Sequence, residues 1–308
     1  RQHRGGLSHE LTVIWVVVVG AQLAIQAPIN SGLGRTVGKL PAALISFFVG
    51  LGLLLVICVA AGELGRFDSL GDAAMPSLFG GFIGATYVAT ATITISRIGA
   101  GAVAAATIAG QLTCSLVVDD FGWVGVDEIG VTGLRVLGAV LLLAGTALVV
   151  HRHRYAEDVG GAGKAGLIAI LAVVAAGALV GIQHPLNAEL ADHIGGPDSA
   201  LMNFFTGTLL LGAIVLFSGQ ANQMRKATEV RWYYLVGGVI GVITVLTALT
   251  AVGTIGAAGL TAAIVTGQLL SSVALDRFGA FGLEVRAVTP RRVIGVLLLI
   301  AGTFLTVS

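Results

Sequence analysis

Ten long apolar runs follow one another along the chain, separated by short stretches that contain charges, glycine or proline. They cover approximately residues 11–33, 41–62, 76–97, 99–118, 133–150, 168–190, 198–219, 233–254, 256–275 and 290–307. A helix needs about 20 mostly apolar residues to cross the hydrocarbon core of a bilayer. The runs are too long for the strands of a membrane barrel and lack their alternation. The sequence therefore predicts an all-α integral membrane protein with ten transmembrane helices.

The composition excludes several other classes of protein. Of the 308 residues, 56% are hydrophobic and only 11% are charged, whereas a soluble domain carries about 25% charged residues. The formal net charge of +1 gives no electrostatic reason to expect a nucleic acid partner. We therefore exclude a soluble enzyme with a single core, a nucleic-acid binder and a disordered protein, and expect the lipid bilayer as the surrounding medium.

The two halves of the chain are copies of one pattern. A shift of 157 residues, without a gap, superimposes polar as well as apolar positions of the halves. Gln26, Pro28 and Asn30 fall on Gln183, Pro185 and Asn187. The same shift places Phe47-Phe48 on Phe204-Phe205, Gly80-Gly81 on Gly237-Gly238, Gly110-Gln111-Leu112 on Gly267-Gln268-Leu269, Ser115 on Ser272, and Asp119 on Asp276. Apolar sequence of low complexity would match in hydrophobicity but not at these polar positions, so the halves are structural repeats.

Each repeat contains five of the predicted helices. Because five is odd, the second repeat enters the membrane from the opposite face, and the repeats have inverted topology. Secondary transporters are commonly built in this way, with the substrate near the midplane between the repeats. We assign residues 1–150 to the first five-helix repeat, 151–164 to a cytoplasmic linker and 165–308 to the second repeat.

Two pairs of predicted helices are joined by very short connections. Only Arg97-Ile98-Gly99 separates the third run from the fourth, and the eighth and ninth meet at Gly253-Thr254-Ile255-Gly256. These tight turns predict that each pair forms an antiparallel hairpin.

Arginine and lysine residues are distributed unequally between the two sides of the predicted bundle. One side, which holds both termini, collects Arg1, Arg4, Arg66 and Arg135, and the other thirteen lie on the side of the linker. Cytoplasmic loops carry an excess of these residues. We therefore expect both termini outside, in the cytoplasmic (inner) membrane of a bacterium.

The motifs resemble those of a known transporter family. Gln26-Ala27-Pro28-Ile29-Asn30, the glycines at 80, 81 and 84, and Gly110-Gln111-Leu112 with Ser115 and Asp119 are similar to the YdcZ-like branch of the drug/metabolite transporter superfamily, in its fused two-repeat form. The resemblance covers nearly the whole chain and occurs twice. It implies transport of a small molecule, a cavity lined by the first four helices of each half, and the fifth and tenth helices at the interface between the halves.

Amide side chains form one face of the first and sixth helices. Gln22, Gln26 and Asn30 are spaced four residues apart and therefore share a face; Gln183 and Asn187 repeat it. Buried polar groups in a membrane usually face the bundle interior or a water-filled cavity. Gln26, Asn30, Gln183 and Asn187 are candidates for substrate binding, and interhelical hydrogen bonding is the alternative. For Gln22, whose counterpart is Leu179, the alternative is favoured.

A second candidate group lies close to the middle of the membrane. The fourth predicted helix is centred near residue 109, so Gln111 lies about 3 Å from the midplane, and Gln268 has the same position in the ninth. Ser115 and Ser272 follow one turn later on the same face. Tyr87 carries the only aromatic hydroxyl deep within a span. These five residues complete the predicted substrate-binding set, with helix packing as the alternative.

No aspartate, glutamate, lysine or arginine lies at the centre of any predicted span. A cationic drug would meet no counter-charge there, so a neutral or zwitterionic metabolite is favoured. Asp119 and Asp276 close the fourth and ninth spans and are candidates for gating or proton coupling, the alternative being helix-end residues in contact with water. His184 is a third candidate, since histidine titrates near neutral pH.

The sequence therefore predicts a secondary transporter that moves a small polar metabolite by alternating access, with proton coupling as one option. The alternatives are a channel with an inverted-repeat pore, a multidrug or cation exporter, and a membrane scaffold without transport. We expect no catalytic residues, no cofactor and no metal site. Because both halves lie on one chain, a monomer is expected to suffice.

Overall fold

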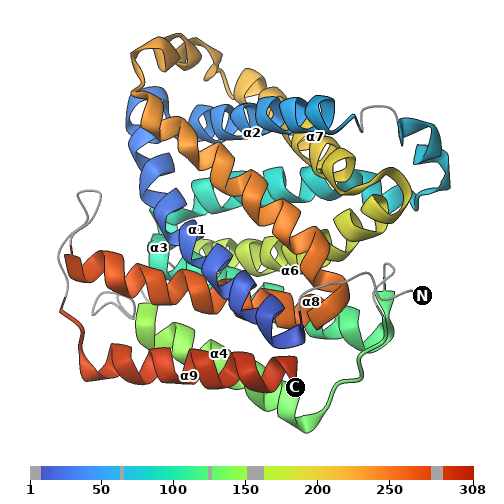
Figure 1. Ribbon diagram of the computed structural model, residues 1–308. Helices are drawn as coiled ribbons and strands as arrows, with labels where there is room; N and C mark the ends of the chain where they lie inside the picture. Colours follow the sequence, from blue (N-terminus) through green and yellow to red (C-terminus); the bar gives the residue numbers. More distant parts are fainter. Residues whose placement is uncertain (1–7, 63–65, 124–126, 151–162, 279–286) are drawn as a thin grey trace.

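The computed structural model describes residues 8–62, 66–123, 127–150, 163–278 and 287–308. Within these ranges the chain is a bundle of long helices with short 3-10 helices between them (Figure 1). The long helices are α1 (His9–Val37), α2 (Lys39–Ala61), α3 (Gly80–Phe121), α4 (Gly133–Val150), α6 (Gly163–Ile194), α7 (Gly196–Phe217), α8 (Val236–Phe278) and α9 (Pro290–Val307). The 3-10 helices are η1 (Arg66–Asp72), η2 (Met75–Phe79), η4 (Ala221–Glu229) and η5 (Trp232–Leu235).

Helices α3 and α8 each cross the bundle twice. In the first segment of α3, Gly84 lies against Gln183 of α6. In the second segment, after the chain has turned back, Gln111 of α3 lies against Gly181 of α6. In α8 the reversal takes place at Gly256, whose φ of 71° and ψ of 172° are not helical, and the bend is visible in Figure 1. The predicted hairpins are confirmed: α3 is divided into two membrane-spanning segments, one ending at Thr94 and the next beginning at Ala102.

The number of membrane crossings agrees with the sequence. In the part of the chain that the structure describes, nine helical segments are long and apolar enough to span a bilayer. The longest of them, in α8, is divided at Gly256, which gives ten crossings. The beginning of α1 and the end of α9 pack in one cluster that contains Val13, Val16 and Val307. Both ends of the described chain therefore lie at the same face of the molecule, as an even number of crossings requires.

Helices α4 and α9, the fifth and tenth crossings, run antiparallel and side by side (Figure 1). Gly138 lies against Gly302, and Gly145 lies against Gly295. The shift of 157 residues converts each of these contacts into the other, so the pair is symmetric about its own midpoint. A twofold axis perpendicular to both helices has this effect, and it lies in the plane of the membrane. The predicted inverted repeats, with the fifth and tenth helices at their interface, are confirmed.

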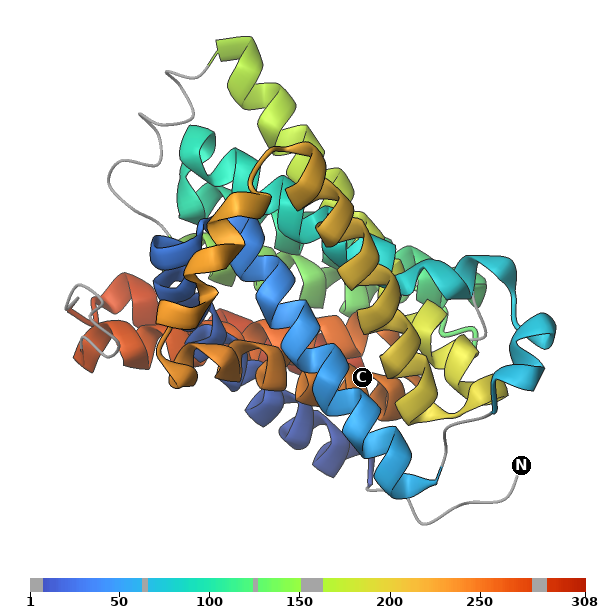
Figure 2. The same ribbon diagram turned by 90° about the horizontal axis from the view of Figure 1, so that it is seen from above.

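The remaining contacts between the halves follow the same symmetry. Helices α2 and α7 lie side by side in both views (Figures 1 and 2), and Gly50 meets Phe204 where Gly207 meets Phe47. Asn30 of α1 packs on Gly237 of α8, and the equivalent Asn187 of α6 packs on Gly80 of α3. Each half thus inserts its first helix between helices of the other half.

The bundle has two ends, which we name by one residue each. The Arg35 face contains the end of α1, the start of α2, the end of α8 and the start of α9; there Arg292 pairs with Asp276. The Asp119 face contains the end of α3, the start of α4, the end of α6 and the start of α7; there Arg135 pairs with Asp119. The twofold axis exchanges these two faces.

Candidate functional site

A cavity of about 880 Å³ lies between α1, α2, α3, α6 and α8. Binding pockets for small molecules typically measure about 300–1,000 Å³. Of the predicted binding residues, Gln26, Asn30, Tyr87, Gln111 and Gln268 line this cavity. The polar lining also includes residues outside the predicted binding set, among them Arg35, Lys39 and Thr107.

The floor of the cavity is built from equivalent positions of both repeats. Gln111 and Gln268 line it together, and so do the equivalent pairs Tyr87 with Thr244, Thr107 with Ile264, Ile108 with Val265, and Leu23 with Val180. Residues that the twofold axis exchanges can meet only near that axis. The floor, with its two glutamine amides, therefore lies at the centre of the molecule.

The mouth of the cavity, in contrast, comes from one face only. Beyond the floor the lining continues through Gln26 and Asn30 to Arg35 and Lys39. The equivalent positions on the other face are Gln183, Asn187, Asp192 and Gly196, and none of these lines the cavity. The cavity is thus open toward the Arg35 face and stops short of the Asp119 face.

The two amides at the mouth are only half-buried and are held by single hydrogen bonds. Gln26 Nε2 donates to the carbonyl oxygen of Gly237 over 2.7 Å, and Asn30 Oδ1 accepts from Ser46 Oγ over 3.0 Å. Each bond joins α1 to a different neighbour, Gln26 to α8 and Asn30 to α2, and both residues line the cavity.

The equivalent amides on the Asp119 face are buried. Gln183 is 9% exposed and donates through Nε2 to Asn203 Oδ1 over 3.3 Å. Asn187 is 1% exposed, and its backbone carbonyl oxygen accepts from Ser199 Oγ over 2.6 Å. The hydroxyl of Ser199 joins the start of α7 to α6. In the first repeat Ala42 occupies the position of Ser199, so this bond has no counterpart at the open mouth.

Apolar side chains complete the closure on the Asp119 face. Ala200 and Leu201 of α7 pack in one cluster with Val242, Val245 and Leu249 of α8. Ala43, Val88 and Thr92 occupy the positions of Ala200, Val245 and Leu249 in the first repeat, and all three line the cavity instead. Helices α7 and α8 are therefore packed together at the Asp119 face, whereas the equivalent helices α2 and α3 are separated at the Arg35 face.

The two predicted serines do not line the cavity. Ser115 is fully buried and shares a hydrogen bond of 3.0 Å with Thr261. Ser272 donates to the backbone oxygen of Leu269 within its own helix. The difference arises because Ala104, which corresponds to Thr261, has no hydroxyl to offer Ser272. Ser115 therefore takes part in helix packing, whereas the hydrogen bond of Ser272 lies within its own helix.

Asp119 is fully buried and bound on both carboxylate oxygens. Oδ1 accepts from the backbone N–H of Ala257 over 2.7 Å, and Oδ2 accepts from that of Ala258 over 3.0 Å and from Arg135. The break at Gly256 leaves those two amides without helical partners, so Asp119 caps the second segment of α8. One alternative for Asp119 was a helix-end residue in contact with water. In this structure its side chain is fully buried.

Sequence reasoning missed Arg135, which it used only to orient the chain. Arg135 is 3% exposed and donates to Asp119, to the carbonyl oxygen of Ile129 over 2.8 Å and to that of Thr306 over 3.0 Å. It thereby joins α3, α4 and α9 at the Asp119 face. The signal was present in the repeat, because the shift of 157 residues places Arg135 on Arg292, sixteen residues after an aspartate in both halves.

Asp276 and His184 have different surroundings. Asp276 pairs with Arg292 at the Arg35 face, where the two side chains are 18% and 12% exposed. His184 lines the cavity. Of the three candidates for gating or proton coupling, His184 is therefore the one in contact with the candidate solute path.

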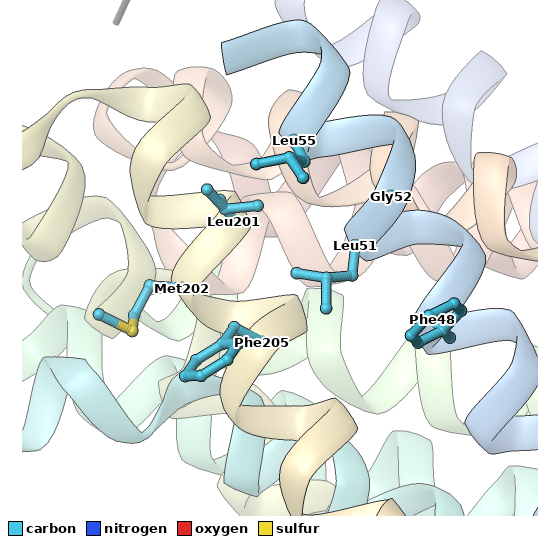
Figure 3. Close-up of a pocket in the computed structure, with 7 residues that line it drawn as sticks. All are labelled: Phe48, Leu51, Gly52, Leu55, Leu201, Met202 and Phe205. Carbon is cyan, nitrogen blue, oxygen red and sulfur yellow. The ribbon is translucent and has the colours of Figure 1, made fainter. Parts of the chain in front are cut away.

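A second hollow, of about 470 Å³, lies between α2 and α7 on the outside of the bundle. Figure 3 shows its lining, which consists of the apolar residues Phe48, Leu51, Gly52, Leu55, Leu201, Met202 and Phe205. Phe48 is 66% exposed and Phe205 47% exposed, as expected for a surface in contact with lipid chains. It offers no polar group to a solute, so the candidate site is the central cavity.

A comparison with known protein families supplies the identity of the chain. The sequence profile of the family described as "Putative inner membrane exporter, YdcZ" matches residues 11–148 and again residues 168–305. The chain belongs to this family. The predicted resemblance is confirmed, and each match covers one five-helix repeat. The chain is thus a multi-pass inner membrane protein and a transporter of the drug/metabolite type.

A solved structure supports the fold independently. A crystal structure titled only "Crystal structure of protein" is similar to this chain with a TM-score of 0.67 and 13% sequence identity. The similarity covers 96% of this chain and 95% of that one. At this identity it supports the arrangement of all ten crossings and says nothing of the substrate. No curated protein matches the chain.

Proposed function

We propose that the protein is a secondary carrier that moves a small polar metabolite, neutral or zwitterionic, by alternating access. The central cavity is the solute path, and Gln111 and Gln268 are the principal binding groups at its floor. The two repeats rock around this floor, so that the mouths at the Arg35 and Asp119 faces open in turn.

One observation carries this proposal: the floor is shared by both repeats, whereas only one of two equivalent mouths is open. Because the repeats have nearly the same packing surfaces, the arrangement of α2 against α3 and that of α7 against α8 can be exchanged. The exchange would close the mouth at Ala43 and Val88 and open the one at Ala200 and Val245. This is the behaviour of a carrier.

The chemistry of the cavity supports a polar solute. Amides at the floor and along α1 offer both donors and acceptors. Among the described residues that line the cavity, none is an aspartate or a glutamate. A cation exporter needs a counter-charge to hold its substrate inside the membrane, and this cavity does not supply one.

The remaining features of the proposal concern orientation and assembly. The excess of arginine and lysine places the Arg35 face in the cytoplasm and both termini outside. Since the first helix of each repeat, α1 or α6, packs against the other repeat on the same chain, the path is complete in a monomer.

The proposal is tested in two steps. A panel of neutral and zwitterionic metabolites is screened for thermal stabilisation of the purified protein, which follows RT ln(1 + [L]/Kd). Stabilising compounds are then tested for counterflow in proteoliposomes. A carrier gives saturable uptake that is accelerated by unlabelled solute on the opposite side, whereas a channel gives flux without counterflow.

The binding groups are tested in the same assay. We expect the double substitution Gln111→Leu and Gln268→Leu to abolish counterflow while the protein remains folded. Gln22→Leu is the matched control, because Gln22 lies in α1 outside the cavity lining and its counterpart is Leu179. Transport that survives the double substitution would show that the floor is not the binding site.

A further inference from the structure

The charged residues that line the cavity are all of one sign. Arg35 and Lys39 are the charged side chains at its mouth, and both are exposed. In the described part of the chain, neither of them forms an ion pair with a carboxylate. The open mouth therefore presents two unneutralised positive charges.

A single turn of the backbone brings these two charges together. Arg35 lies in the last turn of α1, and Lys39 is the first residue of α2. Between them Gly38 adopts a φ of 85°, a backbone conformation that residues with a side chain rarely adopt. The sharp reversal keeps both cations at the cavity rim instead of spreading them along a loop.

The other mouth carries the opposite charge pattern. The position of Arg35 is taken there by Asp192, which is exposed, and that of Lys39 by Gly196. Glu189 and His193 lie beside Asp192 on the same turn of α6 and form a contact of 3.3 Å. The twofold axis therefore relates a mouth with two cationic residues to one where neither equivalent residue is cationic, although the floor between them is nearly symmetric.

The charges act on a solute as it approaches and not after it has bound. Arg35 follows Gln26 by nine residues, about 13 Å along the helix, whereas the Debye length at physiological salt is about 8 Å. Mouths of one sign with walls of low dielectric concentrate oppositely charged solutes and raise their rate of arrival by about 10-fold or more.

From these observations we infer that Arg35 and Lys39 form an access filter for anionic groups, and that the transported metabolite carries an acidic group. This inference rests on the proposed function and refines it. Within the neutral and zwitterionic class it selects solutes with a carboxylate or a similar acid, and it extends the class to small organic anions.

The test measures the charge preference of the mouth without knowledge of the substrate. Cys58 and Cys114 are replaced by alanine, and Thr107→Cys places one reporter thiol in the cavity floor. The rates of its modification by a sulfonate-bearing and by a trimethylammonium-bearing methanethiosulfonate are then compared in the full-length protein. We expect the anionic reagent to react faster, and the ratio of the two rates to fall by about tenfold in the variant Arg35→Gln/Lys39→Gln.

A matched variant controls for net charge. Arg97→Gln/Arg277→Gln also removes two exposed cations outside the cavity lining and is expected to leave the ratio unchanged. Raising the salt concentration to 1 M, where the Debye length is about 3 Å, should reduce the ratio in the parent and hardly affect it in Arg35→Gln/Lys39→Gln.

Two results would overturn the inference, and they can be distinguished. A thiol that reacts equally fast with both reagents would show that the cavity exists but does not select anions, which leaves the proposed function intact. A thiol that reacts with neither reagent would show that the cavity is closed to solutes, and the proposed function would fail with the inference.

Discussion

The Arg35 and Asp119 faces are made by the same sequence motif and yet differ in packing. At the Arg35 face the amides of α1 are half-buried, α2 stands away from α3, and the Asp276–Arg292 pair is partly exposed. At the Asp119 face the equivalent amides, helices and ion pair are buried. Equivalent parts can thus adopt two packing arrangements, and the molecule shows both at once.

A few residues that differ between the two repeats bear on why the Asp119 face, and not the Arg35 face, is the closed one. Ser199, Asn203 and Thr261 form buried hydrogen bonds at the closed face. They stand where the first repeat has Ala42, Ser46 and Ala104, of which only Ser46 has a polar side chain. We infer that these groups of the second repeat favour closure of the Asp119 face.

The largest difference between the faces is expected for the two aspartates. Asp119→Ala leaves Arg135 buried without its charge partner and uncaps two backbone amides, which costs about 3–5 kcal/mol. Asp276→Ala removes a partly exposed pair and should cost about 1 kcal/mol or less. Unfolding in mixed micelles measures both free energies, and equal losses would contradict the difference in burial.

The second prediction concerns the hydroxyl that closes the Asp119 face. Ser199→Ala copies Ala42 of the open mouth and removes a bond worth about 1 kcal/mol, so the population open at that face should rise about fivefold. The population open at the Asp119 face is measured in vesicles of known orientation. An impermeant maleimide is added from that face, and its rate of reaction with Thr107→Cys is recorded. The converse variant Ala42→Ser serves as a control and should lower modification from the Arg35 face.

The smallest effect is expected for Asn203→Ser, which copies Ser46. Its bond to Gln183 is long, at 3.3 Å, and side-chain hydrogen bonds in membranes average about 0.6 kcal/mol. The same maleimide assay should therefore show an increase of about threefold. A change larger than that of Ser199→Ala would reverse the order of the two contributions.

The sequence was sufficient to predict the fold, because its main determinants are local. Ten lipid-length runs set the crossings, and the repeat set their inversion and the glycine contacts of α4 with α9. Gln111 and Gln268 stood out in the sequence as polar residues close to the midplane, and both line the central cavity. Their burial in lipid without a function would be costly.

The remaining part of the site depends on tertiary packing that no pattern reveals. Gln26 and Gln183 occupy equivalent places in one motif, so sequence alone could not tell that one lines a cavity and the other is enclosed. Ser115 and Ser272 share the helix face of the glutamines but are drawn to Thr261 and to the backbone. Arg135 was missed because an arginine at the end of a span can do two things. It can orient the chain in the membrane, and it can pair with a buried carboxylate, but composition shows only the first.

The central claim is that the two mouths open in turn, and distances across both mouths test it most directly. Spin labels at Lys39 and Thr92 report on the Arg35 face, and labels at the equivalent Gly196 and Leu249 report on the Asp119 face. In lipid nanodiscs, double electron–electron resonance should give two distances at each mouth, and Ser199→Ala should shorten the first pair as it lengthens the second. A single distance at each mouth, or changes of the same sign at both, would contradict alternating access.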